Sequence, residues 1–158
     1  MALEVGVKAP DFTLYDATKT KRSLSEFAGK TVVLAFYPGA FTGVCDKEVC
    51  SLRDSMARYN ELNAEVLGIS IDGFPALKEF TAKYNLNFTL LSDFNREVTN
   101  AYDVLFTGLG GVEGYTVANR AVYIVDKDGV IRYAWTAQPN PGVEPNYDEV
   151  IAAVESLG

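Results

Sequence analysis

Cys45 and Cys50 are the only two cysteines in this 158-residue chain, and the chain contains no histidine. Without histidine, the commonest general base and metal ligand is missing, and Ser-His or Cys-His catalytic pairs are excluded. Cysteine becomes the leading candidate for reactivity, by redox chemistry, with inert burial as the alternative. Two thiolates alone leave too few soft ligands for a closed zinc site, so we expect no metal and no cofactor.

The position of Cys45 favours an activated thiol. A strand is expected over residues 31–37, a Pro38-Gly39 turn follows it, and a helix is expected from Cys45 to Leu62. Free amide N–H groups and the helix dipole favour an anion in a first helical turn, and both lower the pKa of a cysteine there. We expect Thr42 to cap the helix or to aim its hydroxyl at the sulfur and a bound oxygen, and Pro38 to shield the turn from water.

The elements that carry these residues alternate along the chain. Runs rich in β-branched and aromatic residues predict strands over residues 31–37, 64–71, 121–126 and 130–135. Helices are predicted over residues 45–62, 75–84, about 96–102 and 147–156. Lys127-Asp128-Gly129 reads as a hairpin turn, which makes the last two strands antiparallel. The order predicts one α/β domain over residues 1–158, with a thioredoxin-like mixed sheet flanked by helices on both faces.

Composition narrows the possible partners. The formal charge of −7 and the scattered 14 basic residues argue against nucleic-acid binding. No apolar run approaches the roughly 18 to 20 residues that span a bilayer, and the start lacks a basic segment followed by an apolar stretch, so we expect no membrane contact and a cytoplasmic protein.

Two segments are expected to be connections. Glycine-rich residues 107–114 fail the G-x-G-x-x-G pattern because Glu113 takes the place of its last glycine, so a flexible loop with little ligand contact is predicted. Residues 138–145, which carry three of the six prolines, are expected to be a surface connection.

The spacing of Pro38, Thr42 and Cys45, Pro-x-x-x-Thr-x-x-Cys, resembles the active-site motif of the peroxiredoxins. The continuation from Cys45 through Cys50 to Asp54 is similar to the PrxQ, or bacterioferritin comigratory protein, subgroup, whose peroxidatic and resolving cysteines are separated by four residues. The resemblance runs from Ala9 to Val130. It implies an enzyme that reduces hydrogen peroxide and organic hydroperoxides through a Cys45 sulfenic acid, which Cys50 resolves as an intramolecular disulfide. It also implies thioredoxin or a similar dithiol protein as reductant.

The same resemblance supplies an arginine. In that family an arginine just before a late strand pairs with the thiolate, and Arg120 matches that position. An always-charged guanidinium beside Cys45 would stabilise the thiolate and donate to peroxide oxygens. Glu48, one turn after Cys45, is expected to hold this arginine.

The implied disulfide sets a geometric demand. Residues five apart in a regular helix have Cα atoms about 8.7 Å apart, whereas a disulfide tolerates at most about 7 Å. A bond between Cys45 and Cys50 therefore requires the first turns of the helix to unwind, which implies a cycle between a packed reduced state and a locally unfolded oxidised state.

Other functions use the same residues. A general thiol-disulfide oxidoreductase normally has Cys-x-x-Cys at its helix start, unlike the spacing here. A peroxide-responsive redox sensor without efficient turnover would need the same unwinding but no reductase. The sequence leaves the preferred peroxide open, as well as the choice between monomer and homodimer.

Overall fold

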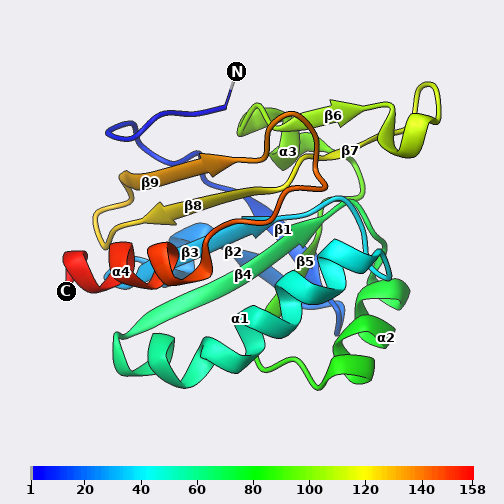
Figure 1. Cartoon of the computed structure of the whole chain (residues 1–158). Helices are drawn as coiled ribbons and strands as arrows, with labels where there is room; N and C mark the ends of the chain where they lie inside the picture. The colour runs from blue at the N-terminus through cyan, green and yellow to red at the C-terminus, as the bar shows by residue number, and fades with distance from the viewer. Residues whose placement is uncertain (1) are drawn as a thin grey trace.

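A seven-stranded mixed sheet forms the centre of the computed structural model, which describes residues 2–158 (Figure 1). The strands lie in the order β2, β1, β5, β4, β3, β8, β9. Neighbours β3 and β4 are parallel, as are β4 and β5, and the other pairs are antiparallel. The bounds are β1 Thr13–Asp16, β2 Lys21–Ser23, β3 Thr31–Phe36, β4 Ala64–Ser70, β5 Thr89–Ser92, β8 Ala121–Val125 and β9 Ile131–Thr136.

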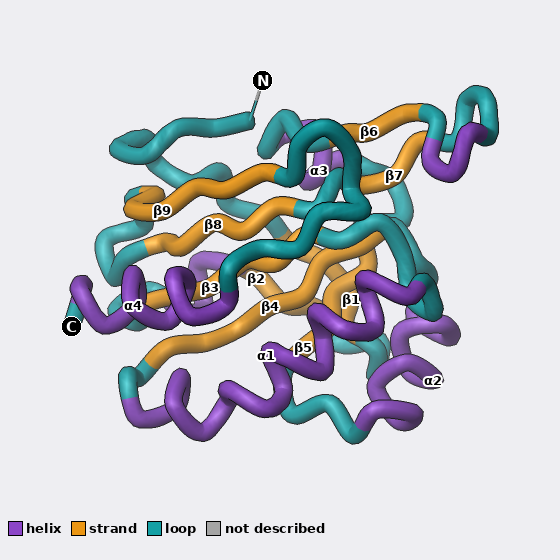
Figure 2. The backbone as a smooth tube through the Cα atoms, in the orientation of Figure 1, coloured by secondary structure: helices purple, strands orange, loops and turns teal. Residues whose placement is uncertain are grey.

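Helices cover both faces of this sheet. On one face lie α1 (Gly43–Glu61), α2 (Phe74–Tyr84) and α4 (Tyr147–Leu157), and Figure 2 shows α1 running from the end near α2 toward the opposite edge. The other face carries α3 (Glu97–Ala101) and the 3-10 helix η1 (Leu24–Phe27). A separate two-stranded hairpin, β6 (Leu105–Thr107) and β7 (Thr116–Ala118), encloses the 3-10 helix η2 (Leu109–Gly111) and extends beyond the sheet.

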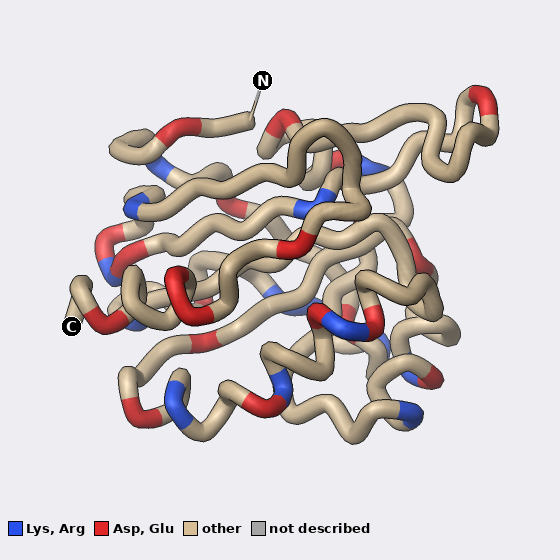
Figure 3. Tube along the Cα trace, in the orientation of Figure 1, with Lys and Arg blue, Asp and Glu red and all other residues tan. Residues whose placement is uncertain are grey.

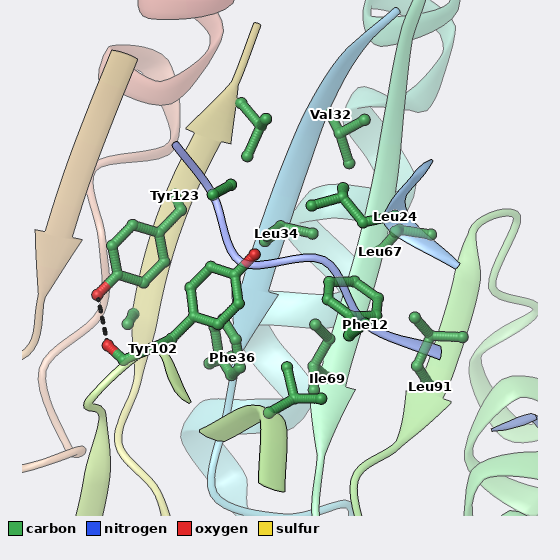
Figure 4. Packing of buried hydrophobic residues seen from close by; sticks show 14 of the residues in the cluster. Phe12, Leu24, Val32, Leu34, Phe36, Leu67, Ile69, Leu91, Tyr102 and Tyr123 are labelled. Atoms are coloured by element: carbon green, nitrogen blue, oxygen red, sulfur yellow. Dashed lines mark hydrogen bonds between the residues drawn. The ribbon is translucent and has the colours of Figure 1, made fainter. Parts of the chain in front are cut away.

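Strand β3 joins the two core layers. Its side chains alternate between faces, and Val32, Leu34 and Phe36 pack in the layer toward α3, while Val33 and Ala35 pack toward α1 and α4. Figure 4 shows the first layer, in which aromatic rings of Phe36, Tyr102 and Tyr123 meet. Burial on both faces explains the continuous apolar sequence of β3. The end of this strand leads into the site described below.

The predicted α/β class, with a thioredoxin-like mixed sheet and helices on both faces, is confirmed. Each of the four predicted helices and four predicted strands is present, with ends shifted by at most two residues. The Lys127-Asp128-Gly129 hairpin is also present, and β8 and β9 are antiparallel as expected. Five short strands, β1, β2, β5, β6 and β7, were not predicted.

Charge is distributed without a basic patch along the described chain, and Figure 3 shows acidic and basic positions interspersed over the fold. Among residues 2–158, none of the helices combines the length and the apolar character needed to cross a membrane.

Candidate active site

Cys45 lies in the first turn of α1, as predicted. Thr42 is the N-cap residue of this helix, with extended backbone angles, and the Asp46 amide donates to the Thr42 carbonyl at 2.9 Å. Cys45 is the third helical residue, so its own amide belongs to the group that has no partner within the helix. Its side chain is fully buried, between the end of β3 and the inner face of α2.

Arg120 reaches the sulfur from the start of β8. Its Nη2 donates to Cys45 Sγ at 3.1 Å, its Nη1 donates to Glu48 Oε1 at 2.7 Å, and its Nε donates to the Pro141 carbonyl at 2.8 Å. The predicted pairing of Arg120 with Glu48 is therefore present. Arg120 and Glu48 are only 2% and 1% exposed, so water screens little of the interaction among these groups. These three hydrogen bonds fix the orientation of the guanidinium plane beside the sulfur.

Burial disfavours the charged form of both members of this pair. Burial raises the pKa of Glu48 to about 7, although the Arg120 charge and hydrogen bond oppose the shift. Oε2 of Glu48 has no hydrogen-bond partner within the described residues, which leaves half of the carboxylate unsolvated. For Arg120, burial opposes the charge, but Glu48 and Cys45 raise the pKa overall, so the guanidinium stays protonated.

The loop before α1 closes the site on one side. Pro38 is buried and lines the pocket beside Arg120. Thr42 stands at the N-cap, yet its hydroxyl makes no capping bond and instead donates to the Gly39 carbonyl at 3.0 Å. Thr42 lines the same pocket as Pro38 and Arg120, and its hydroxyl oxygen can still accept hydrogen bonds while it donates. The side-chain cap, one of the two roles expected of Thr42, is thus absent.

Asp72 holds this loop, and sequence reasoning missed it. Its Oδ2 accepts from the Ala40 amide at 2.8 Å and from the Ser70 hydroxyl at 2.7 Å. Asp72 follows β4, which runs parallel to β3, so both strands end at the same edge of the sheet. A carboxylate just after a predicted strand was the available signal.

Cys50 lies five residues, or about 1.4 turns, farther along α1, in a continuous helix, and is partly exposed. Both cysteines are free thiols, so the structure corresponds to the packed reduced state. A disulfide between Cys45 and Cys50 would therefore require the first turns of this helix to unwind, as the sequence predicts.

A cavity of about 430 Å³ opens beside Arg120, Thr42 and Pro38. Its outer wall comes from the β6–β7 hairpin, through Leu109, Val112 and Tyr115. Residues 107–114 were expected to be a flexible loop with little ligand contact, whereas Leu109, Gly110 and Val112 of this segment line the cavity beside Arg120. The expected surface connection over residues 138–145 is mostly exposed, but Pro141 is buried and holds Arg120.

A buried helix-start cysteine held by an arginine–glutamate pair on a thioredoxin-like sheet defines a thiol-based redox enzyme. The chain belongs to the AhpC/TSA family, whose sequence model matches residues 5–134. It is a peroxiredoxin of the PrxQ and bacterioferritin comigratory protein kind, a thiol-dependent peroxidase. The resemblance seen in the sequence is confirmed.

Two sequence relatives agree with this assignment. Peroxiredoxin Q of Oryza sativa subsp. japonica, which is named chloroplastic, is 40% identical over 152 residues, covering 96% of this chain and 67% of the relative. A putative peroxiredoxin bcp of Coxiella burnetii is 38% identical over 151 residues, covering 96% of this chain and 98% of the relative.

Solved structures give the same fold. Peroxidoxin BcpB of Mycobacterium tuberculosis superposes with a TM-score of 0.85 at 28% identity, covering 99% of each chain. The bacterioferritin comigratory protein of Xanthomonas campestris, described with alkyl peroxide reduction activity, has a TM-score of 0.81 at 25% identity, covering 92% of this chain and 90% of that one. Enzymes of this family act on peroxides with thioredoxin-type reductants.

Proposed function

We propose that Cys45 is the peroxidatic cysteine and that Arg120 is the residue that activates it. The 3.1 Å contact between Arg120 Nη2 and Cys45 Sγ carries this assignment. The thiolate attacks one oxygen of a hydroperoxide, the O–O bond breaks, and the other oxygen leaves as water or an alcohol after taking a proton. Sulfur is oxidised to a sulfenic acid and the peroxide is reduced.

Arg120 supports this step through its fork of donors. A guanidinium fixed by Glu48 and Pro141 needs no rearrangement when charge moves from the sulfur to the leaving oxygen. Glu48 acts as the residue that positions Arg120. Thr42 and Pro38 complete the pocket, where the lone pairs of the Thr42 hydroxyl can accept a hydrogen bond from the hydroperoxide.

Cys50 completes the cycle as the resolving cysteine. Its thiol attacks the Cys45 sulfenic sulfur, the S–O bond breaks, and water leaves with the thiol proton. The first turns of α1 unwind in this step, because the helical geometry keeps the two Cα atoms too far apart. A dithiol protein then opens the disulfide by thiol exchange and is itself oxidised.

The cavity favours substrates larger than hydrogen peroxide. Its volume of about 430 Å³ greatly exceeds the ~30 Å³ that one water occupies in the liquid. Its lining combines Thr42 and Arg120, which contacts the Cys45 sulfur, with apolar side chains that include Leu109 and Val112 of the hairpin. This combination suits an organic hydroperoxide whose –OOH group binds Arg120 and Thr42 while its carbon chain contacts the hairpin, and hydrogen peroxide can bind the same two polar side chains.

Thioredoxin is our proposed reductant and the cytoplasm our proposed location. A cycle that regenerates two thiols needs a reducing compartment, which the cytoplasm provides. The Coxiella burnetii relative matches along nearly its whole length, whereas the plant relatives are named chloroplastic. Either a monomer or a homodimer can carry this cycle, because both cysteines lie in one helix.

A single peroxide pulse tests the assigned roles. One equivalent of hydrogen peroxide is mixed with the reduced wild type, Cys45→Ser and Cys50→Ser, and free thiols are counted by alkylation and mass spectrometry. We expect loss of two thiols in the wild type, no reaction in Cys45→Ser, and a trappable sulfenic acid in Cys50→Ser. Consumption of peroxide by Cys45→Ser at the wild-type rate would overturn the assignment.

A further inference from the structure

Tyr84, the last residue of α2, contacts α1 at two points. Its hydroxyl donates to Asp46 Oδ2, and its backbone carbonyl accepts from Arg53 Nη1 at 2.7 Å. Asp46, Cys50 and Arg53 have the spacing i, i+4 and i+7, so they lie along one stripe of the helix. Tyr84 therefore bridges this stripe from one side of Cys50 to the other.

The same turn of α2 also contacts the loop before Cys45. The Phe80 ring lies 5.1 Å from the Phe41 ring and 5.5 Å from the Tyr84 ring. Lys83 Nζ lies 5.5 Å from the centre of the Phe41 ring and 5.2 Å from that of Tyr84. In Figure 1 the start of α1 accordingly lies against α2. The entry to α1 and its first two turns are thus held by one neighbouring helix end.

The two hydrogen bonds of Tyr84 lie on different sides of Cys50, and only one of them involves the segment that has to unwind. Asp46 lies between the two cysteines, so its bond from Tyr84 must break before the disulfide can form. Arg53 lies beyond Cys50, and its bond to the Tyr84 carbonyl can persist. Loss of the Tyr84–Asp46 bond therefore removes one restraint on residues 43–50, in addition to the contacts that Arg120 makes with Cys45 and Glu48, while the rest of α1 stays anchored to α2.

We propose that Tyr84 is a positioning residue that latches the first turns of α1 and sets the rate at which Cys50 reaches the oxidised Cys45. The inference rests on the roles proposed above for the two cysteines. While the latch is closed, the Cys45 sulfenic acid remains in the pocket and can meet a second peroxide. That reaction transfers one oxygen to sulfur, giving a sulfinic acid and water or an alcohol.

The latch is available throughout the neutral pH range. The hydrogen bond to Asp46, followed by burial and the Asp46 charge, raises the pKa of Tyr84 to about 12. The hydroxyl therefore remains protonated and able to donate at neutral pH.

Tyr84→Phe tests the proposal, because it removes the hydroxyl and keeps the ring and the backbone carbonyl that binds Arg53. Reduced protein is pulsed with hydrogen peroxide, quenched by alkylation at millisecond times, and analysed by mass spectrometry. We expect disulfide formation to become about tenfold faster, as loss of one hydrogen bond to a charged group implies. The sulfinic fraction at high peroxide should fall, with sulfenic acid formation nearly unchanged.

Tyr133→Phe is the matched control. Tyr133 also donates its hydroxyl to a carboxylate, Glu149 Oε1 at 3.0 Å, but it lies on β9 and contacts α4. This variant should keep the wild-type rates. If the wild type forms the Cys45–Cys50 disulfide and Tyr84→Phe forms it at the same rate or more slowly, the latch is overturned. Failure of the wild type to form that disulfide would instead overturn the proposed role of Cys50.

Asp46→Ala and the double variant separate a latch from general destabilisation. If the two side chains act through one hydrogen bond, Asp46→Ala should accelerate disulfide formation much less in the Tyr84→Phe background than in the wild type. Hydrogen exchange of amides 46–50 should rise in Tyr84→Phe without a change in the core strands. Additive effects, or a uniform rise in exchange, would contradict the latch.

Discussion

Arg120 serves three acceptors with one rigid side chain. Its Nε and two Nη groups donate to Pro141, Glu48 and Cys45, so all three directions of the guanidinium are occupied. A lysine at this position would present one flexible ammonium and could not keep these contacts together. The sulfur, the carboxylate and the loop after β9 are thus fixed relative to one another by a single residue.

Glu48 gives stability a pH dependence of unusual sign. Burial raises its pKa from the ordinary 4.5 to about 7, so the folded protein holds this proton more tightly than the unfolded chain. The resulting stabilisation is complete below about pH 4.5 and is lost as pH rises to about 7. We therefore expect the free energy of unfolding of the wild type, measured relative to Glu48→Gln, to decrease between pH 5 and pH 8 in urea titrations.

Asp16→Asn provides the control for this measurement. Burial opposes ionisation of Asp16, but hydrogen bonds from Thr18 and Thr20 and the Arg22 charge lower its pKa below the ordinary 3.8. Its contribution is present above that value and is lost only at more acid pH. The difference between wild type and Asp16→Asn should thus stay constant from pH 5 to pH 8. A constant difference for Glu48→Gln as well would show that Glu48 is ionised throughout.

Sequence reasoning found the residues of the site that share a local pattern. Cys45, Thr42 and Pro38 lie in one motif, Glu48 is one helical turn away, and Arg120 came from the resemblance to a family. The partners of Thr42 and Asp46 were not predictable in the same way. A hydroxyl can donate or accept, and the Thr42 hydroxyl donates to the Gly39 carbonyl in the turn before α1. Tyr84 meets Asp46 only because α2 packs against α1, which no local spacing reveals.

The β6–β7 hairpin contributes apolar side chains to the wall of the pocket. Val112, which is 56% exposed, lines the cavity without contributing to the core. We expect Val112→Asp to raise KM for cumene hydroperoxide about three- to tenfold, because a carboxylate replaces apolar surface that would contact the ring. The kcat/KM value for hydrogen peroxide should not change. Steady-state assays with a thioredoxin system measure both values.

Val5→Asp is a matched control for the hairpin, since Val5 is also 56% exposed and lies outside the pocket lining. It should leave both substrates unaffected. Equal losses with cumene hydroperoxide and hydrogen peroxide in Val112→Asp would indicate a structural effect on the site instead of a contact with the organic group.

The helices and strands were predicted correctly where they are long enough for the periodic pattern of apolar residues to be recognised. Helices α1, α2 and α4 each extend over at least 11 residues, and their ends agree with the sequence within two positions. Strands β1, β2, β5, β6 and β7 have three or four residues, too few for alternation to differ from chance. Pairing with neighbours that are distant in sequence, such as β1 with β5, creates these strands.

At the scale of the whole molecule, strand β3 connects both layers of the core, as do β4 and β8. Since alternate side chains of β3 belong to opposite layers, neither layer can unfold while the other keeps its packing. Length and an apolar content of 48% predicted one domain over residues 1–158, which stays a prediction. The layout of the sheet was less predictable, because strand order depends on contacts across the chain, as in the insertion of β5 between β1 and β4.

We therefore expect the reduced protein to unfold in a single cooperative transition. Far-UV circular dichroism follows mainly the helices, and fluorescence of Trp135, the only tryptophan, follows β9 beside β8. Urea curves from both probes should coincide when a reductant keeps Cys45 and Cys50 as thiols. In the Cys45–Cys50 disulfide form, the unwound start of α1 should lower the helical signal before unfolding begins. Two separated transitions in the reduced protein would mean that the layers unfold independently, despite the strands that they share.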